Sequence, residues 1–428
     1  MQEASKSEAE GAGYGFSAGR PMSWRTPAVI LVCGCLIAVL GFGARSGLGF
    51  FLTPMSSAHG WGRDLFALAL AIQMLLWGAA QPVAGAVADR FGAVPVLSAG
   101  AVLYALGLAA MAYAETPAML HLSAGVMIGF GLAGSSFTVV IGAFGRLMPP
   151  QWRSLSFGAG TAAGSFGQFL FSPLAVALID GYGWQLTLVI FAALVLLIMP
   201  LSLALASPRR APAPAQQRAA VVPAQQTAAQ ALAEACGHTS YVLLVLGFFT
   251  CGFQIFFISV HLPADLVDRG LPAEVGGLTL GVIGLFNIIG AIAAGWLSNL
   301  MPKRYLLSFI YFGRALAILV YIMLPPSAVV TVLFGAVLGL LWLSTVPPTS
   351  GLVALMFGTR WLTMLFGFAF FSHQVGGFLG VWLGGLLFER TGSYDMVWWL
   401  SILFGLLSAV INLPIVEKPV PRLAAASA

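Results

Sequence analysis

The sequence predicts an all-α membrane protein with twelve transmembrane helices in two pseudo-symmetric halves of six. Three observations predict this class. First, 59% of the 428 residues are apolar and only 8% are charged, whereas a soluble globular protein carries about 25% charged residues. Second, apolar runs of the roughly 20 residues that a helix needs to cross hydrocarbon recur from Thr26 onward. Third, a segment rich in Pro, Ala and Gln divides these runs into two sets of six.

The apolar runs are predicted to be helices. Hydrocarbon offers no partner to unpaired backbone groups, and the runs are too long and too uniformly apolar for the strands of a barrel. We place the twelve spans near residues 27–54, 64–88, 93–114, 117–145, 154–179, 184–206, 239–263, 273–298, 304–324, 327–357, 361–388 and 395–415.

The segments between and beyond these runs complete the domain organisation. The N-terminal segment is polar and Gly/Ser-rich and lacks the apolar core of a signal peptide, so we expect a disordered tail. The central segment has the composition of a flexible linker, although residues 225–236 favour a short helix along the membrane surface. The predicted segments are a tail at 1–25, a first half at 26–206, a linker at 207–238, a second half at 239–416 and a tail at 417–428.

The placement of Lys and Arg predicts the orientation. Fourteen basic residues lie on the side of the N-terminal tail and three, Arg63, Arg269 and Arg390, lie on the opposite side. This positive-inside bias predicts that both tails and the linker are cytoplasmic. We expect a multi-pass protein of the plasma membrane, which in a bacterium is the inner membrane. The net charge of +5 follows from this topology, and the scattered basic residues do not suggest a nucleic-acid partner.

The two halves resemble each other at an offset of about 210 residues. Gly85 and Asp89 close the second predicted span, and Gly295 and Asn299 close the eighth. Glycine-rich fifth and eleventh spans also correspond. Parallel repeats of six spans, with a substrate site between them near the midplane, are typical of one large group of secondary transporters.

The segment from Gly85 to Gly92, GAVADRFG, resembles the cytoplasmic loop motif of the major facilitator superfamily, G-x-x-x-D-R/K-x-G. The resemblance implies the major facilitator fold. It also implies that Asp89 and Arg90 pair between the halves and with helix ends to hold one gate state. The alternative is an ordinary surface ion pair. Together with its repeat copy at Gly295 and Asn299, this motif is the predicted gating element.

Within that superfamily, the chain resembles the monocarboxylate porters and the related oxalate/formate antiporters. The fifth span runs RSLSFGAGTAAG from Arg153 and is followed by Gly183-Trp184, which is similar to the R-x-x-A-x-G-x-x-x-A-G pattern of the porters and their following Gly-Trp. The antiporters place a Lys in the eleventh span, and His373 and Gln374 stand near that depth here. The resemblance implies transport of a small monocarboxylate.

The chain departs from the porter pattern at two places. The porters carry a Lys in the first span, where Arg45 stands here. They carry an Asp and an Arg four residues apart in the eighth span, where Asn287 and Ala291 stand here. The carboxylate that the resemblance would link to protons is therefore absent from that position.

Arg45 is the predicted anion-binding residue. It stands about ten residues, or roughly 15 Å, from the outer end of its span, among glycines that allow a ligand to come close. Ionisable groups in hydrocarbon are costly and therefore suggest function. Without a carboxylate partner, a buried guanidinium would bind an anion in bidentate fashion. The alternative is an arginine held by backbone carbonyls and water.

His373 is the predicted proton-coupling residue. It lies about twelve residues into the eleventh span, near the midplane, and an imidazole there can both bind a carboxylate and carry a proton. The alternative is a neutral histidine bonded between helices. Arg314 also lies within a span, and we interpret it as a structural residue that reaches inward to carbonyls.

Uncharged polar and aromatic residues on the other spans are further candidates. Each alone is an ordinary interhelical hydrogen bond or packing contact, but as a set around one cavity some should touch substrate. The predicted substrate-binding residues are Arg45, Asn287, Gln254, Phe257, His373, Gln374, Trp342 and Gln73.

These features predict a secondary active transporter that moves a small organic anion, a monocarboxylate, by alternating access with proton symport or anion exchange. The alternatives are an efflux carrier for amphiphilic drugs, or a non-transporting sensor on the same fold. No phosphate-binding loop, catalytic set or metal cluster is apparent in the sequence, so we expect neither enzyme activity nor cofactor nor metal. The expected partners are the anion, a co-transported proton and the lipid bilayer, and the expected state is a monomer.

Overall fold

The computed structural model describes residues 24–206, 226–358 and 361–422, and all regular elements within these ranges are helical. Residues 1–23, 207–225 and 423–428 of the predicted tails and linker lie outside the described residues. The helices are α1 (Pro27–Ser46), η1 (Leu48–Phe51), α2 (Leu52–His59), α3 (Arg63–Phe91), α4 (Ala93–Ala112), α5 (Pro117–Leu120), η2 (His121–Met127), α6 (Ile128–Gly134), α7 (Phe137–Leu147), α8 (Pro150–Tyr182), α9 (Trp184–Leu196), α10 (Ile198–Ser202), η3 (Leu203–Leu205), α11 (Ala228–Cys236), α12 (Thr239–Asp268), α13 (Ala273–Leu300), α14 (Lys303–Met323), α15 (Ala328–Leu341), α16 (Val346–Phe357), α17 (Leu362–Thr391) and α18 (Asp395–Asn412).

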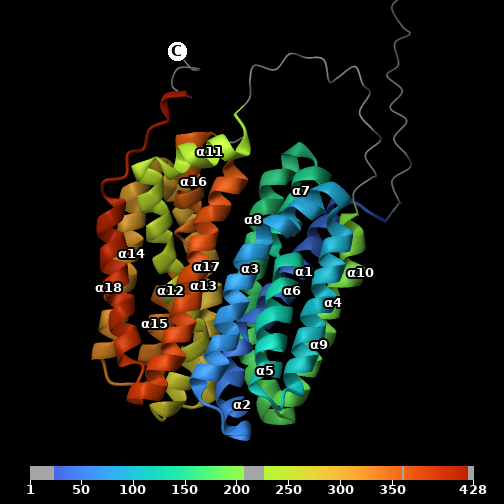
Figure 1. Ribbon diagram of the computed structural model, residues 1–428, viewed down its shortest axis with the longest axis vertical. Helices are drawn as coiled ribbons and strands as arrows, with labels where there is room; N and C mark the ends of the chain where they lie inside the picture. The colour runs from blue at the N-terminus through green and yellow to red at the C-terminus, as the bar shows by residue number, and fades with distance from the viewer. Residues whose placement is uncertain (1–23, 207–225, 359–360, 423–428) are drawn as a thin grey trace, which may run out of the picture.

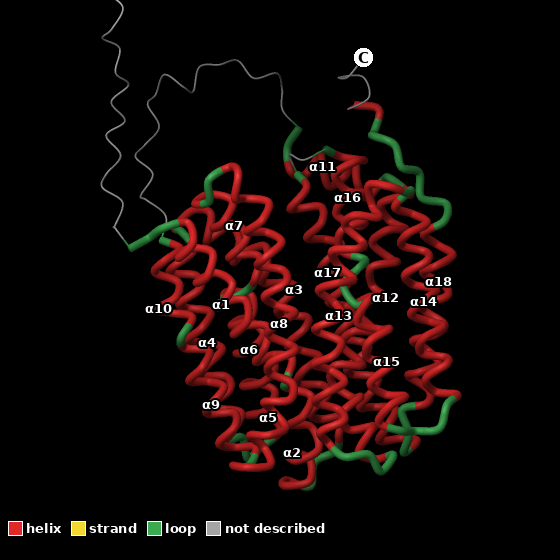
Figure 2. The backbone as a smooth tube through the Cα atoms, turned by 180° about the vertical axis from the view of Figure 1, so that it is seen from behind, coloured by secondary structure: helices red, strands yellow, loops and turns green. Residues whose placement is uncertain are grey.

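The helices form two bundles that stand side by side. In Figure 1 the first bundle, α1 to α10, lies to the right, and the second, α12 to α18, lies to the left, with the short helix α11 across its top. The described chain begins and ends at the same end of the molecule, which also carries α7 and α11, and we call it the terminal end (Figures 1 and 2). The opposite end carries α2 and α5, and we call it the distal end.

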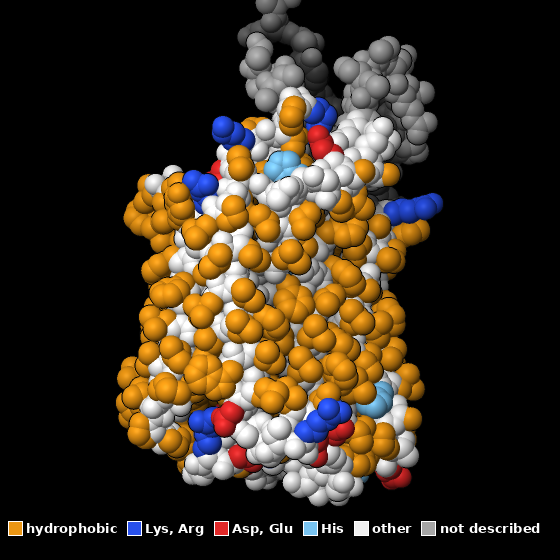
Figure 3. All heavy atoms as spheres, turned by 60° about the vertical axis from the view of Figure 1, so that its left-hand side comes forward, with side chains coloured by type: hydrophobic (Ala, Val, Ile, Leu, Met, Phe, Trp, Pro, Cys, Tyr) orange, Lys and Arg blue, Asp and Glu red, His pale blue; other side chains and the backbone are white. Residues whose placement is uncertain are grey.

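The surface identifies the molecule as a multi-pass membrane protein. Twelve helical stretches of the described chain are long and apolar enough to cross a membrane. Figure 3 shows a broad apolar band around the middle, with charged side chains gathered toward the two ends. Large apolar side chains of the spans are exposed as well, such as Ile292 (68% exposed) and Phe309 (65% exposed). Water does not tolerate a continuous apolar surface of this size, whereas lipid does. The predicted fold class is confirmed.

The seventh span is longer than the sequence predicts. We expected it to end near residue 263, but α12 continues to Asp268. Pro263 stands inside the helix without ending it. The extension brings Asp265 and Asp268 onto the last turns of a membrane-spanning helix, and Asp265 is buried. The distal end therefore contains a buried carboxylate that the hydropathy pattern did not reveal.

Two spans are interrupted at corresponding places. In the fourth span, α6 ends at Gly134 and α7 begins at Phe137; in the tenth, α15 ends at Leu341 and α16 begins at Val346. The two restarts are therefore separated by nearly the same offset as the sequence repeat. A break inside the membrane leaves backbone groups without helical partners, and they must be satisfied by neighbouring protein groups.

Arg314 and Asn287 supply those partners at the tenth span. The Arg314 guanidinium donates to the carbonyl of Leu341 from Nε (2.9 Å) and Nη2 (2.6 Å), and Nη2 also donates to the carbonyl of Trp342. The Asn287 Oδ1 accepts from the backbone N–H of Leu343 at 3.0 Å. Arg314 is 1% exposed and thus acts as an internal clamp on the break.

Replacing Arg314 should lower the stability of the second half. In Arg314→Met the apolar stem is retained, but two buried carbonyls lose their donor, at about 1–3 kcal/mol each. We expect a clear fall in the unfolding temperature of the purified protein. The measurement is thermal unfolding monitored by intrinsic fluorescence. The matched control is Arg390→Met, which changes an exposed arginine at the distal end of α17. Equal unfolding temperatures for the two variants would contradict the clamp.

Candidate functional site

The candidate site lies between the halves, where α1 and α3 of the first bundle meet α12 and α17 of the second. Arg45 stands in the last turn of α1, just before the helix gives way to η1 at Gly47. Gly49 follows, and a Cβ there would approach the carbonyl oxygen of Val260 in α12 to 2.9 Å. The glycines that flank Arg45 therefore allow the first span to press against the other half.

Arg45 is a buried cation with weak partners. It is 5% exposed, and its Nη2 donates to the sulfur of Met74 at 3.1 Å. The guanidinium carbon lies 4.3 Å from the centre of the Phe256 ring and 6.0 Å from that of Trp77. Its Nε has no hydrogen-bond partner among the described residues. A thioether and an aromatic face compensate a buried charge only in part, so this site favours an incoming anion.

His373 and Gln374 approach the same point from α17. The Gln374 Nε2 donates to the carbonyl of Met74 at 3.4 Å, so the amide oxygen faces His373, whose Nδ1 lies 3.3 Å away. In a neutral imidazole the Nδ1 must then carry the hydrogen, and the Nε2 presents a bare lone pair. His373 is 4% exposed, and within the described chain this Nε2 has no partner.

Four rings surround these groups, and we call Trp77, Phe256, Phe370 and His373 the aromatic box. Trp77 lies edge-on to Phe256 (6.5 Å between centres) and to Phe370 (6.0 Å). His373 stacks on Phe370 at 5.7 Å and meets Phe256 edge-on at 5.4 Å. The rings come from α3, α12 and α17, so both halves contribute to the box.

The structure brings only part of the predicted site together. Arg45 and Gln374 both bond Met74, and His373 lies beside Gln374 and Phe256, whereas the other predicted residues are engaged elsewhere. Phe256 rather than Phe257 faces Arg45, because Phe257 packs on Trp398 with ring centres 4.8 Å apart. The sequence reasoning did not select Met74, Trp77 or Phe370, which carry no charge and resemble ordinary apolar residues of a span.

The remaining predicted residues hold the helices together. Gln73 donates to the carbonyl of Ala124 at 2.8 Å within the first half. Gln254 donates to the carbonyl of Ser401 at 2.9 Å and accepts from Arg314, and the carbonyl of Trp342 also accepts from Arg314. Asn287 donates to the hydroxyl of Ser165 at 2.9 Å and so joins α13 to α8 of the other half.

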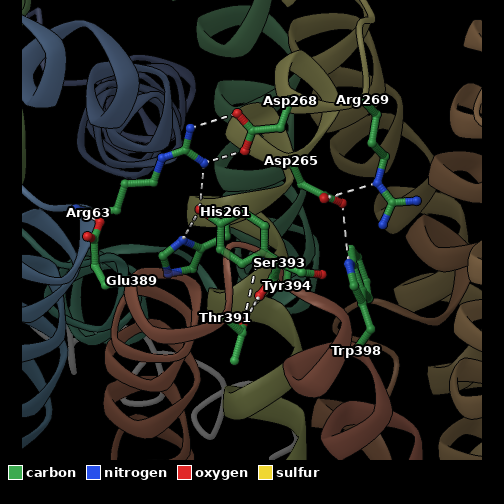
Figure 4. A network of polar contacts seen from close by, with 10 residues as sticks. All are labelled: Arg63, His261, Asp265, Asp268, Arg269, Glu389, Thr391, Ser393, Tyr394 and Trp398. Atoms are coloured by element: carbon green, nitrogen blue, oxygen red, sulfur yellow. Dashed lines mark hydrogen bonds and ion pairs between the residues drawn. The ribbon is translucent and has the colours of Figure 1, made fainter.

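An ion pair joins the two halves at the distal end (Figure 4). Arg63 of α3 bonds both oxygens of Asp268 of α12, at 2.5 and 2.8 Å, and donates to the hydroxyl of Tyr394 at 3.2 Å. The backbone N–H of Arg63 donates to Glu389 of α17 at 2.6 Å, and its guanidinium lies 4.1 Å from the centre of the Phe388 ring. We call this set the distal latch.

Buried polar residues support the latch from behind. Burial raises the pKa of the Tyr394 hydroxyl, which therefore stays protonated and lies 3.3 Å from the Nδ1 of His261. His261 must carry its hydrogen on Nε2, because that atom lies 2.8 Å from the carbonyl of Val381. Asp265 accepts from Arg269 at 3.0 Å and from Trp398 at 3.3 Å. Each of these side chains therefore has a partner that fixes the geometry of the latch.

Comparison with known proteins identifies the family. The sequence model of the Major Facilitator Superfamily matches residues 34–381. The chain belongs to the Major Facilitator Superfamily. The superfamily consists of transporters, and the relatives confirm the resemblance to the superfamily and to monocarboxylate transporters.

The relatives include two proteins of known sequence that match most of the chain. The uncharacterized MFS-type transporter YcxA of Bacillus subtilis (strain 168) is 30% identical over 385 residues, which cover 87% of this chain and 91% of that protein. Human monocarboxylate transporter 11 is 28% identical over 350 residues, which cover 78% of this chain and 70% of that protein.

Solved structures of the superfamily have the same fold. A bacterial homolog of the human lysosomal transporter Spinster, in an inward-facing and occupied conformation, superposes with a TM-score of 0.72 over 90% of this chain and 96% of that chain, at 14% identity. The D-xylose-proton symporter superposes with a TM-score of 0.66 over 93% of this chain and 99% of that chain, at 16% identity.

Glycines along the interface show which end of this superfamily member is open. A Cβ on Gly385 near the distal end would meet the Arg63 carbonyl oxygen at 2.8 Å, and one on Gly284 at mid-height would meet that of Ser165 at 2.7 Å. Toward the terminal end, a Cβ on Gly85, Gly158, Gly295 or Gly367 would meet nothing within 4 Å. The halves are thus in contact at the distal end and apart at the terminal end, as Figure 1 also shows.

The predicted gating motif lies at the open end. Arg90 is exposed, with its guanidinium 5.2 Å from the centre of the neighbouring Phe91 ring, and Asn299 bonds the carbonyl of Gly295 in its own helix at 3.3 Å. Gly92 has φ 94° and links α3 to α4. The side chain of Asp89 lies outside what the structure describes. Pairing of this motif between the halves therefore stays a prediction for the conformation that closes this end.

Weakening the distal latch should open the distal end. Asp268→Asn and Arg63→Gln each remove the ion pair, and water already screens the partly exposed Asp268, so we expect a cost of about 1 kcal/mol, or about fivefold in the open population. Hydrogen exchange at the distal ends of α3, α12 and α17 should speed up accordingly. The double variant should add little to either single change.

The matched control for the latch is Glu115→Gln, an exposed carboxylate between α4 and α5 at the same end. It should leave hydrogen exchange unchanged. Exchange that is equally slow in wild type and both latch variants would refute the gating role of the ion pair.

Proposed function

We propose that the chain is a secondary active transporter that carries a monocarboxylate across the membrane by alternating access. The observation that carries the proposal is Arg45, a buried cation between the halves whose Nε lacks a partner and whose Nη2 bonds only a thioether sulfur in the described chain. Monocarboxylate transporters among the relatives support the substrate class.

A substrate carboxylate would complete the coordination of Arg45. It would accept from the guanidinium in bidentate fashion, displace the sulfur of Met74, and remain beside the Phe256 ring. A charge-assisted pair in a dry site is much stronger than the contacts it replaces. Because Phe256 belongs to the second half and Arg45 to the first, the bound anion would also bring the halves together.

Proton coupling follows from the tautomer of His373. In the neutral ring the Nε2 lone pair would repel a carboxylate, whereas the protonated ring would donate a hydrogen bond to it. Proton and anion would therefore bind together and be released together, which is symport. Exchange of one anion for another would require the anion alone to allow the conformational change.

The Lys and Arg distribution supports a topology with both termini and the linker in the cytoplasm, in the plasma membrane of the cell. In that orientation the conformation described above is open to the cytoplasm, and the distal latch closes the outer end. The transporter would act as a monomer, since each chain contains both halves and the site between them.

Removing the Arg45 charge should abolish transport without harming the fold. In proteoliposomes we expect Arg45→Ala to lower counterflow of labelled monocarboxylates at least about tenfold, because charge-assisted hydrogen bonds contribute about 1.5–3 kcal/mol each. The unfolding temperature should stay level or rise, because a poorly compensated buried charge disappears. Arg45→Lys should retain part of the activity. Normal flux in both Arg45 variants would refute the assignment of Arg45 as the anion site. The control is Arg390→Ala.

Replacing His373 should make the rate of uptake nearly independent of pH. Wild-type uptake should rise as the pH falls, because the protonated ring binds the anion. His373→Gln offers a neutral donor at every pH, so its uptake should be slower but nearly independent of pH. The measurement is initial uptake between pH 5 and 8 in proteoliposomes, with His59→Gln at the distal end as control. An unchanged pH profile in His373→Gln would exclude this residue as the coupling site.

A further inference from the structure

The aromatic box constrains the body of the substrate, beyond the carboxylate that Arg45 binds. Trp77, Phe256 and Phe370 present faces and edges at interplanar angles of 61° and 75°, and His373 adds a fourth ring at 78° to Phe256. Aromatic rings prefer such edge-to-face partners at separations of about 4.5–7 Å. A ligand whose carboxylate lies on Arg45 would place its body among these rings, since Arg45 lies on the face of Phe256.

The polar atoms around the box are mostly occupied. The indole N–H of Trp77 donates to Gln81 at 3.0 Å, and Gln81 in turn donates to the hydroxyl of Ser136 at 2.8 Å. Both ends of the Gln374 amide are used by Met74 and His373. Among Arg45, Gln374 and the described residues of the box, the buried polar atoms without a hydrogen-bond partner are the Nε of Arg45 and the Nε2 of His373, and the Cys251 thiol interacts with the His373 ring.

This inventory matches a substrate with one anionic group and few other polar atoms. One carboxylate would accept from Arg45, and protonated His373, which packs on the same Phe256 ring, would add a second positive charge nearby. A hydroxyl or a second carboxylate on the ligand would then be desolvated without a partner, which disfavours binding.

The partners of the buried and distal arginines also disfavour a second anionic group on the ligand. Arg314 is committed to the carbonyls of the tenth span. Arg63 and Arg269 are paired with Asp268 and Asp265 at the distal end. Of these four arginines, Arg45 is the one without a carboxylate or carbonyl partner in the described chain.

The position of the rings suggests how such a ligand would be enclosed. Phe370 stands nearly one turn closer to the terminal end of α17 than His373 and is only partly buried. Trp77 faces it from α3 of the other half. Since the terminal end is the open one, these two rings, in contact across the halves, form the wall that a ligand entering from that end meets first.

We propose that the site selects monocarboxylates whose body is an aromatic ring, such as arylacetates, over short aliphatic, hydroxylated or dicarboxylic acids. The inference rests on the proposed function, because it takes Arg45 as the carboxylate-binding residue. It adds the chemical class of the part of the substrate that Arg45 does not touch.

The test is competition for counterflow in proteoliposomes of the full chain, with radiolabelled phenylacetate and radiolabelled lactate as parallel probes. Competitors are phenylacetate, cyclohexylacetate, lactate, acetate and phenylsuccinate. We expect phenylacetate to compete at least about tenfold better than lactate and acetate, and severalfold better than cyclohexylacetate, which has a similar size but no ring quadrupole. Phenylsuccinate, with its second carboxylate, should compete poorly.

Variants of the box identify the ring contribution. Trp77→Leu and Phe370→Leu should reduce the preference for phenylacetate over cyclohexylacetate severalfold. If Trp77→Leu fails to fold, Trp77→Phe replaces it in the test, and this variant should keep most of the preference. Phe404→Leu, which alters a ring packed on Phe249 and Phe253 inside the second half, is the control and should keep the preference.

The outcomes separate the two proposals. Arg45-dependent flux of lactate or acetate without preference for aromatic acids would overturn this inference and leave the monocarboxylate carrier standing. Absence of any Arg45-dependent carboxylate flux would overturn both. A preference for phenylacetate that survives in both Leu variants would also overturn the assignment to the aromatic box.

Discussion

The absence of water from the hydrocarbon core is the constraint on which the rest of this structure depends. Every backbone group and every charge within the spans must find its partner inside the protein. The clamp of Arg314 on the broken tenth span and the bonds of Asn287 to Ser165 and Leu343 are consequences of that constraint. Nine buried side-chain atoms of the described chain keep no hydrogen-bond partner, and two of them, the Nε of Arg45 and the Nε2 of His373, belong to the candidate site.

The two ends of the molecule serve the cycle in different ways. At the distal end a partly exposed ion pair, backed by buried Tyr394 and His261, holds the halves together. At the terminal end the interface glycines face open space. An ion pair near the surface contributes little to stability, so a conformational change that breaks this one would cost little. A bound anion that touches both halves shifts this balance only by the difference in its affinity for the two conformations.

Much of the fold could be predicted from the sequence, because the hydropathy and length of each span are set by the hydrocarbon core that it crosses. Charged residues within spans, such as Arg45, were recognisable for the same reason. The partners of Arg45 were not, since Met74 and Trp77 differ from other apolar residues only in their tertiary position. Phe256 and Phe257 show the limit most clearly: one residue turns the side chain by about 100° around a helix, and no charge or periodicity marks which of the two faces the interface. Asn287 and Gln254 were selected because they are polar, but the same polarity makes them useful for joining helices.

The clamp on the tenth span also bears on how the carrier can be energised. In other secondary transporters, carbonyls released at a broken helix form part of the coordination shell of a sodium ion. Here a guanidinium that is covalently part of the protein fills that shell at Leu341 and Trp342. An inorganic cation cannot occupy those carbonyls while Arg314 holds them. The break in the tenth span therefore carries a built-in cation where a metal ion would otherwise have to bind.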